Sequence, residues 1–276
     1  MTLIEFTKHY ISFHFDSSHR KSEVNGLYDF EYDILKALGE DKNTLFIKSR
    51  MMYLSTMYSA YMLWFLLYND SYHTEIFYIS PTYRHVYGKM SNFLKMFLST
   101  RNSYFNENEI FINKESIRLG NKQITFKKVL NDSVGMLPNR DRCKVVILDD
   151  YPEDREFISL ITLFRMMGVK MSIGKSLSFD ETETEKIYYE ATDFICYKFP
   201  YYLNPNWEME KTQYLTNNKI MFLTSMECEF INHKNEFNYL QRDIELLTYE
   251  SRGVFKKAKT ELIKLIGYEN IHSDEL

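Results

Sequence analysis

The segment Lys144–Leu148 (KVVIL) is almost entirely apolar and runs directly into two aspartates, Asp149 and Asp150. A short apolar run of this kind is typical of a buried strand. Three further short apolar runs are predicted strands, and polar or charged residues lie at or just past their ends. They are Thr44–Ile47, Glu75–Ser80 and Lys219–Leu223. We therefore expect a sheet whose polar residues gather where its strands end.

Helical patterns alternate with these strands. Six segments are predicted helices: Leu27–Leu38, Met51–Tyr68, Arg84–Leu98, Phe157–Met167, Glu236–Tyr249 and Phe255–Ile266. Residues 109–130 alternate around Gly120 and Asn121, as a hairpin does. Strands that alternate with helices indicate an α/β fold with a largely parallel sheet, which binds ligands at the carboxyl ends of its strands. Residues 177–190 are acidic, and we interpret residues 177–218 as an insertion in this fold.

The composition suits a globular protein with one large domain, since 45% of the 276 residues are hydrophobic and 26% are charged. A net charge of −4 and a pI near 6.0 exclude a global basic surface, so nucleic-acid binding would need a local patch or an assembly. Three scattered cysteines without a C-x-x-C pair favour a reducing compartment and no structural zinc. We expect neither a signal peptide nor a membrane span, so the terminal Ser273–Leu276, which resembles an ER-retention signal, has no route to act.

The pair Asp149–Asp150 has the pattern of a Walker B motif with Asp in the place of the usual Glu. One carboxylate can hold Mg²⁺, and the other can orient or deprotonate an attacking water. We therefore expect Asp149 to bind the metal and Asp150 to position the water. The alternative is a strand that continues into an acidic turn, since Tyr151–Asp154 also contains acidic residues.

The segment after Thr44–Ile47 has the context of a phosphate-binding loop, because Ser55 and Thr56 stand at the start of the next helix. The usual pattern G-x-x-x-x-G-K-[ST] is broken, however. Its two glycine positions and its lysine position are held by Lys48, Tyr53 and Leu54. Without glycine in this loop, other residues must adopt the backbone conformations that glycine provides, at a cost in strain. The alternative interpretation is a loop with two basic residues before a core helix.

The sequence Lys48-Ser49-Arg50, followed by Ser55-Thr56, resembles the variant loop of the large terminases, the motors that package viral DNA. In that variant a basic residue at the start of the loop replaces the usual lysine. The run Ala60–Trp64 resembles the helix that follows, and three more motifs fall in the family's order. They are Asp29-Phe30-Glu31 in place of the adenine-sensing aromatic–Gln motif, Ser80-Pro81-Thr82 at the end of the second strand, and Thr224-Ser225 in place of the coupling motif.

This resemblance, which covers roughly residues 27–240, implies a P-loop NTPase-like fold of the additional-strand, RecA-like class. It also implies an ATP-driven double-stranded DNA translocase with ATP and Mg²⁺ as cofactors. The nucleotide would be bound by Lys48, Ser49, Arg50, Ser55, Thr56 and Glu31, and the metal by Ser55 and Asp149. Asp150 and Arg50 would be catalytic, with Arg50 adding a bidentate phosphate contact. Thr224 and Ser225 would couple hydrolysis to DNA movement.

The implied partners are double-stranded DNA, a portal protein, a small terminase subunit and, where it is encoded separately, a nuclease. The implied assembly is a homo-oligomeric ring without membrane association, in the host cell cytoplasm and transiently at the capsid portal. We expect residues 1–26 to be an N-terminal extension, 27–250 the motor domain and 251–276 a helical tail. Because only 36 residues (276 minus 240) follow Leu240, we expect no nuclease domain and no nuclease activity.

Other basic residues offer further candidates. Arg84, Arg140 and Arg142 are candidates for an arginine that acts in trans on a neighbouring subunit. The candidates for DNA binding are Lys122, Lys127 and Lys128. These three lysines fit a solvated hairpin face equally well. Gly174-Lys175-Ser176 resembles the end of a P-loop, but five residues separate it from Gly168 where the motif needs four. Because no good strand leads into it, we expect a surface loop.

Several departures from the family pattern leave alternatives open. Asp150 reaches less far than Glu, and Glu31 cannot donate the amide hydrogen of Gln. These changes permit a slow ATPase, one completed by neighbouring subunits, or an inactive ATPase-fold protein with a structural role in a packaging complex. A helicase-like or recombination ATPase on the same fold is another alternative. A helicase would need a second ATPase-like lobe, which the chain length disfavours. A nucleotide-independent DNA-binding protein is disfavoured by the acidic pI.

Overall fold

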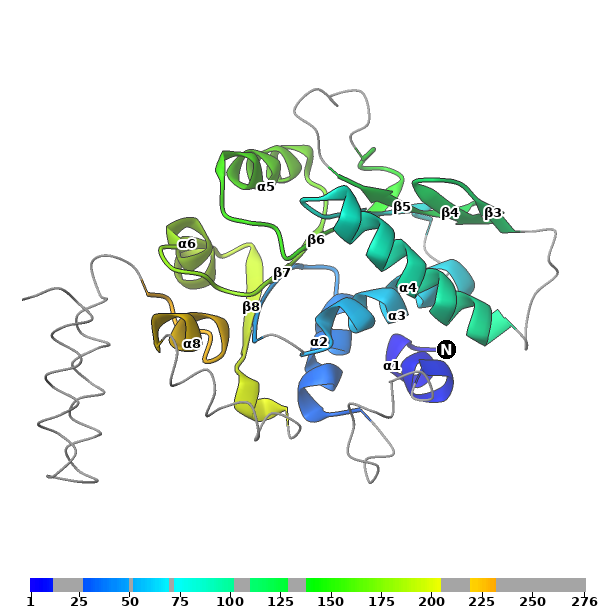
Figure 1. Cartoon of the computed structure of the whole chain (residues 1–276). Helices are drawn as coiled ribbons and strands as arrows, with labels where there is room; N and C mark the ends of the chain where they lie inside the picture. Colours follow the sequence, from blue (N-terminus) through cyan, green and yellow to red (C-terminus); the bar gives the residue numbers. More distant parts are fainter. Residues whose placement is uncertain are drawn as a thin grey trace, which may run out of the picture. The chain divides into compact units, whose positions relative to one another are not determined.

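The computed structural model describes residues 1–11, 27–49, 52–69, 72–101, 110–128, 138–204 and 219–231. In this part of the chain eight strands form one sheet in the order β3-β4-β5-β2-β6-β7-β1-β8 (Figure 1). The strands are β1 (Asn43–Lys48), β2 (Glu75–Ile79), β3 (Ile110–Ile112), β4 (Ser116–Leu119), β5 (Lys122–Lys127), β6 (Cys143–Asp149), β7 (Met171–Lys175) and β8 (Phe194–Phe199). The strands from β5 to β8 in this order are parallel, and β4 and β3 extend the sheet in antiparallel fashion. The predicted α/β fold with a largely parallel sheet is confirmed.

Helices cover both faces of the sheet (Figure 1). The helices α2 (Asp29–Gly39), α3 (Leu54–Tyr68) and α4 (Tyr83–Arg101) share one core with one face, and α5 (Arg155–Met167) and α6 (Thr182–Glu190) share a second core with the other. Side chains alternate between the two cores along each strand, so that Phe46 lies in the first and Leu45 and Ile47 in the second. Both faces of the central strands are therefore buried, which explains their continuous apolar runs.

The helices begin and end where the sequence provides the chemistry. In α5 the side chain of Asp154 accepts a hydrogen bond from the backbone N–H of Phe157 at 2.9 Å, and Gly168 ends the helix with a φ of 63°. Helix α3 instead has buried residues on every side, from Leu54 to Leu66. Among the described residues, no helix combines the length and apolar character that a membrane span requires.

Strand β7 corrects the prediction that Gly174-Lys175-Ser176 forms a surface loop. Met171–Lys175 is fully buried and pairs in parallel with β1 on one side and β6 on the other. A Cβ atom at Gly174 would lie 2.5 Å from Cδ2 of Leu54 and 3.0 Å from the hydroxyl of Tyr58, so glycine allows α3 to approach the strand. The prediction was wrong because the Ser, Gly and Lys of this strand interrupt the apolar pattern that marks its neighbours.

Two further corrections concern the segment after β7. Residues 177–204, the described part of the predicted insertion 177–218, belong to the fold, because they contain α6 and β8, and β8 pairs with β1 along its whole length. Lys219–Leu223 is not a strand but part of the helix α8 (Lys219–Ser225). Short apolar runs fit a buried strand and a buried helix equally well, which accounts for the second error.

The chain divides into two compact units, Met1–Phe230 and Ile231–Leu276. The predicted helices Glu236–Tyr249 and Phe255–Ile266 lie outside the described residues. At the other end, Leu3 and Phe6 of α1 (Leu3–Phe6) belong to the same core as α2 and α3. The boundaries at residues 27 and 250 stay predictions.

Candidate functional site

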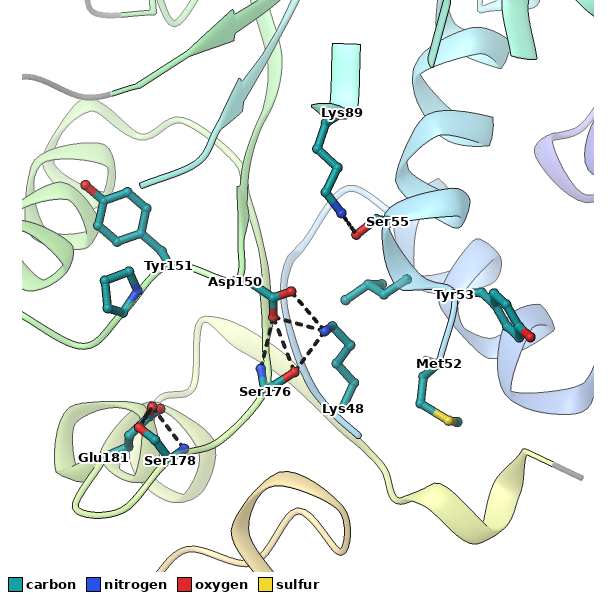
Figure 2. Close-up of a pocket in the computed structure, with 12 residues that line it drawn as sticks. Lys48, Met52, Tyr53, Ser55, Lys89, Asp150, Tyr151, Ser176, Ser178 and Glu181 are labelled. Carbon is teal, nitrogen blue, oxygen red and sulfur yellow. Dashed lines mark hydrogen bonds and ion pairs between the residues drawn. The ribbon is translucent and has the colours of Figure 1, made fainter. Parts of the chain in front are cut away.

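A pocket of about 690 Å³ opens where β1, β6 and β7 end and α3 begins (Figure 2). The predicted residues Lys48, Ser55 and Asp150 line it. Lys89 and Ser176 line it as well, although the sequence did not mark them as site residues. The strands are parallel, so residues from positions far apart in the chain meet at one edge of the sheet.

Lys48 is the last residue of β1 and is only 6% exposed. Its ammonium donates to both carboxylate oxygens of Asp150, at 2.9 and 3.2 Å, and to the hydroxyl of Ser176 at 2.9 Å. Figure 2 shows these three side chains pointing toward one another. The lysine expected to hold phosphate and the acid expected to position water are thus paired with each other.

In the predicted phosphate-binding loop between β1 and α3, the backbone of Tyr53 adopts a conformation that glycine normally supplies. Tyr53, which stands at the second glycine position of the broken pattern, has φ 51° and ψ 16°, in the left-handed region. Its carbonyl then accepts from the N–H groups of Thr56 and Met57, at 2.8 and 3.0 Å, which closes the first turn of α3. The expected backbone strain is therefore located at a named residue.

Ser55 and Asp149, the two predicted metal ligands, are also in contact. The Ser55 hydroxyl donates to Oδ2 of Asp149 at 2.7 Å, and the Tyr78 hydroxyl donates to the same oxygen. The other oxygen, Oδ1, is buried and has no hydrogen-bond partner among the described residues. A hydroxyl and a carboxylate with spare acceptor capacity fit the oxygen ligands that Mg²⁺ prefers.

Lys89 of α4 is the second cation of the site. Its ammonium donates to the hydroxyl of Ser55 and lies 3.2 Å from Oδ2 of Asp149. Burial raises the pKa of Asp149, but the charges of Lys89 and Lys48 and the hydrogen bonds from Tyr78 and Ser55 together hold it below its ordinary value. Because α4 follows β2 at this edge of the sheet, its first turns pass the site. That topology is the signal by which Lys89 could have been found.

Ser176 directly follows β7, and its backbone N–H and hydroxyl both lie 3.3 Å from Oδ1 of Asp150. Thr224 and Ser225, the predicted coupling residues, do not occupy this position. Both of those residues are buried in α8, and neither lines the pocket. Met226, which follows them, accepts from the Ser49 hydroxyl at 3.6 Å and so connects α8 with the end of β1.

Other predicted site residues point elsewhere or lie outside the described residues. The N–H of Ser49 donates to the carbonyl of Phe199, the last residue of β8, at 2.9 Å. Glu31 is fully buried in α2 and accepts from the N–H of Tyr28 at 2.8 Å. Neither Glu31 nor Thr56 lines the pocket, and Arg50 lies outside the described residues.

The candidate arginines fall at different ends of the sheet. Arg140 and Arg142 precede β6, so they lie at the end of that strand opposite to Asp149. Arg84, in the first turn of α4, is at the same edge as the pocket. Lys122 begins β5 and Lys127 ends it, so the three predicted DNA-binding lysines do not form one cluster. Of these three lysines, only Lys127 and the adjacent Lys128 lie at the same edge of the sheet as the pocket.

Solved structures with the same fold are ATPase domains of phage large terminases. The ATPase domain of the Thermus phage P74-26 large terminase matches with a TM-score of 0.56 and 11% identity, over 74% of this chain and 94% of that one. The large terminase of a thermophilic bacteriophage, in complex with ATP-gamma-S, matches with a TM-score of 0.53 and 11% identity, over 74% and 53%. The bacteriophage HK97 large terminase gives 0.51 and 11%, over 73% and 44%. No protein-family model and no curated protein matches the sequence.

The strand order and the position of the site define a P-loop NTPase-like fold of the additional-strand, RecA-like class. The additional strand is β7, which lies between β1, ending at Lys48, and β6, ending at Asp149. More specifically, the fold is that of the large terminase ATPase domain.

Proposed function

We propose that this chain is an ATPase of the large-terminase type, which hydrolyses ATP with Mg²⁺ and uses the energy to move double-stranded DNA into a viral capsid. The observation that carries the proposal is the meeting of Lys48, Ser55 and Asp150 in one pocket at the carboxyl edge of the sheet, with the buried Asp149 in contact with Ser55.

The roles follow from the contacts. Lys48 is the group that would bind the β- and γ-phosphates, since its ammonium projects into the pocket from the end of β1. Ser55 and Asp149 would hold Mg²⁺, which would neutralise charge on the phosphates. Asp150 would orient the attacking water once Lys48 releases it. Arg50 remains part of the proposal as a second phosphate ligand.

Two sets of hydroxyls are proposed to report the state of the γ-phosphate. Ser176 touches both Lys48 and Asp150, so its hydrogen bonds must change when either residue engages a ligand. Thr224 and Ser225 remain proposed coupling residues, and their route to the site is through Met226 and Ser49. Glu31, Ser49 and Thr56 would act around the nucleotide only after a change from the positions described above.

The proposed partners are double-stranded DNA, a portal protein, a small terminase subunit and, where it is encoded separately, a nuclease. The proposed assembly is a homo-oligomeric ring that works in the host cell cytoplasm, at the capsid portal. Arg84, at the pocket's edge of the sheet, is the preferred candidate for an arginine donated to a neighbouring subunit.

An alternative function is an ATPase-fold protein that has lost turnover and serves a structural role in a packaging complex. Two observations favour it: the left-handed Tyr53 in a loop without glycine, and the pairing of both acids with lysines. A structural protein of this kind would keep the fold and the ion pairs without releasing them.

The test is Mg-ATP binding and hydrolysis by the purified chain, with and without double-stranded DNA. Lys48→Ala and Asp149→Ala should abolish hydrolysis, whereas Lys36→Ala, on the exposed face of α2, should leave it unchanged. DNA-stimulated hydrolysis that both variants lose supports the motor. Binding without turnover supports a site that neighbouring subunits or a partner complete. Absence of binding overturns the motor and leaves the structural alternative standing.

A further inference from the structure

Lys89 places a cation between the two residues that the proposed function assigns to the metal. Its ammonium contacts the Ser55 hydroxyl and lies 3.2 Å from Oδ2 of Asp149 (Figure 2 shows the contact with Ser55). Ser55 itself donates to the same Oδ2 at 2.7 Å. The ammonium, the hydroxyl and the carboxylate oxygen therefore form a closed triangle.

The carboxylate in this triangle is deeply buried and the lysine is not. The side chain of Asp149 is 1% exposed and that of Lys89 is 29% exposed. A buried carboxylate needs a nearby cation, because its charge is poorly solvated. Lys48, the other lysine of the pocket, forms its ion pair with Asp150. Lys89 is accordingly the direct ion-pair partner of Asp149.

The backbone holds Lys89 at this place. Val86, Met90 and Phe93, which are buried on neighbouring turns of α4, belong to the same core as α3. The helix is thereby anchored beside the start of α3, where Ser55 lies. A cation tethered in this way has a high effective concentration at the site, whereas a free metal ion must be recruited from solution.

A divalent metal on Ser55 and Asp149 would need the space of the Lys89 ammonium. Mg²⁺ lies about 2.0–2.1 Å from its oxygen ligands, and an ammonium nitrogen lies about 2.7–3.2 Å from the oxygens to which it donates. The two oxygens are 2.7 Å apart, and the ammonium already contacts both. Two cations at this position would overlap and repel each other, so one excludes the other.

We propose that Lys89 is a tethered cation that occupies the divalent-metal position between Ser55 and Asp149 when no metal is bound, so that it supports the binding of nucleotide phosphates without metal and must be displaced before Mg²⁺ binds there. The ligand class, nucleoside phosphates, rests on the proposed function, but the competition between Lys89 and the metal does not. Lys89→Met should therefore have two effects. It opens the oxygen pair to a divalent ion, and it makes nucleotide binding depend on that ion.

The first test uses the metal alone. Free Mn²⁺ is titrated against the full chain and followed by electron paramagnetic resonance. Lys89→Met should bind Mn²⁺ about tenfold more tightly than the natural chain, because a charge-assisted contact no longer competes. Lys89→Arg, which keeps the cation, and Lys95→Met, an exposed lysine of the same helix, should both behave like the natural chain. Adding Asp149→Asn to Lys89→Met should remove the gain. Equal Mn²⁺ affinity in Lys89→Met and the natural chain overturns the proposal.

The second test measures a fluorescent ADP analogue with EDTA and with Mg²⁺. In EDTA, Lys89→Met should bind the analogue about tenfold more weakly than the natural chain, and Mg²⁺ should restore its affinity. Equal affinities of the two proteins in EDTA overturn the proposal. If no variant binds the analogue in either solution, the proposed nucleotide function fails, and the Mn²⁺ titration still decides the role of Lys89. Circular dichroism of each variant establishes that it is folded.

Discussion

Lys48 and Asp150, 102 positions apart in the chain, form an ion pair at 2.9 Å inside the candidate phosphate site. A phosphate ligand must compete with this carboxylate for the lysine. The pair therefore opposes binding until it is broken, while both residues are needed in the proposed reaction.

Asp150→Asn should separate these two effects. Nucleotide affinity is expected to rise about fivefold, the equivalent of about 1 kcal/mol for a pair that is exposed on one side, while hydrolysis falls. Isothermal titration with an ATP analogue and a phosphate-release assay measure the two quantities. Asp33→Asn, on the exposed face of α2, is the control. A loss of affinity in Asp150→Asn would show that the pair does not compete with the ligand.

The left-handed backbone of Tyr53 leads to a second prediction, made by comparing two substitutions that both remove the ring. Tyr53→Gly should be more stable than Tyr53→Ala by about 1 kcal/mol, because glycine adopts a φ of 51° without the clash that a Cβ causes. Urea unfolding of both variants gives the difference. Equal stabilities would mean that the segment adopts another conformation in solution.

The buried pair of Lys175 and Glu181 supplies a third prediction. Their charged groups lie 3.0 Å apart, with side chains 2% and 6% exposed, and the ammonium also lies 4.4 Å from the ring centroid of Phe157. Lys175→Met should cost about 3 kcal/mol of unfolding free energy, because it leaves a buried carboxylate without its partner. The double variant with Glu181→Leu should cost less than Lys175→Met alone. If the two losses simply add, the charges are not coupled.

Lys170 predicts a pH dependence. Burial, followed by the charge of Lys144, lowers the pKa of Lys170 from 10.5 to about 8. Between these values the unfolded chain retains a proton that the folded protein has released. The contribution of Lys170 to the free energy of unfolding should therefore rise as the pH increases from 8 toward 10.5.

Urea unfolding at about pH 7.5 and about pH 9.5, on either side of the lowered pKa, checks this prediction. The stability of the natural chain relative to Lys170→Met should increase at the higher pH, while the comparison with the exposed Lys36→Met should not change. The ammonium of Lys170 also donates to the carbonyls of Leu38, at 3.2 Å, and Glu40. A neutral amine can keep a hydrogen bond of this kind, so the loss of charge should not undo the gain.

The sequence was sufficient to predict three of the strands that carry the site. β1, β2 and β6 are apolar runs that end in polar residues. That pattern, together with the resemblance to large terminases, predicts one site for Lys48, Ser55, Asp149 and Asp150. β7 was not predicted because two of its residues are explained only by tertiary contacts. Gly174 packs against α3, and Lys175 forms an ion pair with Glu181. The helix at Lys219–Ser225 was taken for a strand because its length and apolar character allow either.

The missing parts of the site depend on tertiary contacts. Lys89 lies 34 positions from Ser55 and 60 positions (149 minus 89) from Asp149, and nothing in its immediate sequence distinguishes it from the exposed Lys95 on the same helix. Ser176 belongs to the site because β7, which it directly follows, lies between β1 and β6 in the sheet. Sequence patterns identify strand ends, but the sheet order determines which ends are neighbours.

The contact of Ser49 with Met226 joins residues 177 positions apart. Ser49 also donates to the carbonyl of Phe199, and the carbonyl of Met226 accepts from the N–H of Tyr201. These hydrogen bonds therefore connect the end of β1, the end of β8 and the residue after α8. A ligand that displaced Lys48 would also shift its neighbour Ser49 and, through these hydrogen bonds, the ends of β8 and α8. A change at the candidate phosphate site would thus reach both elements without any rearrangement of the core.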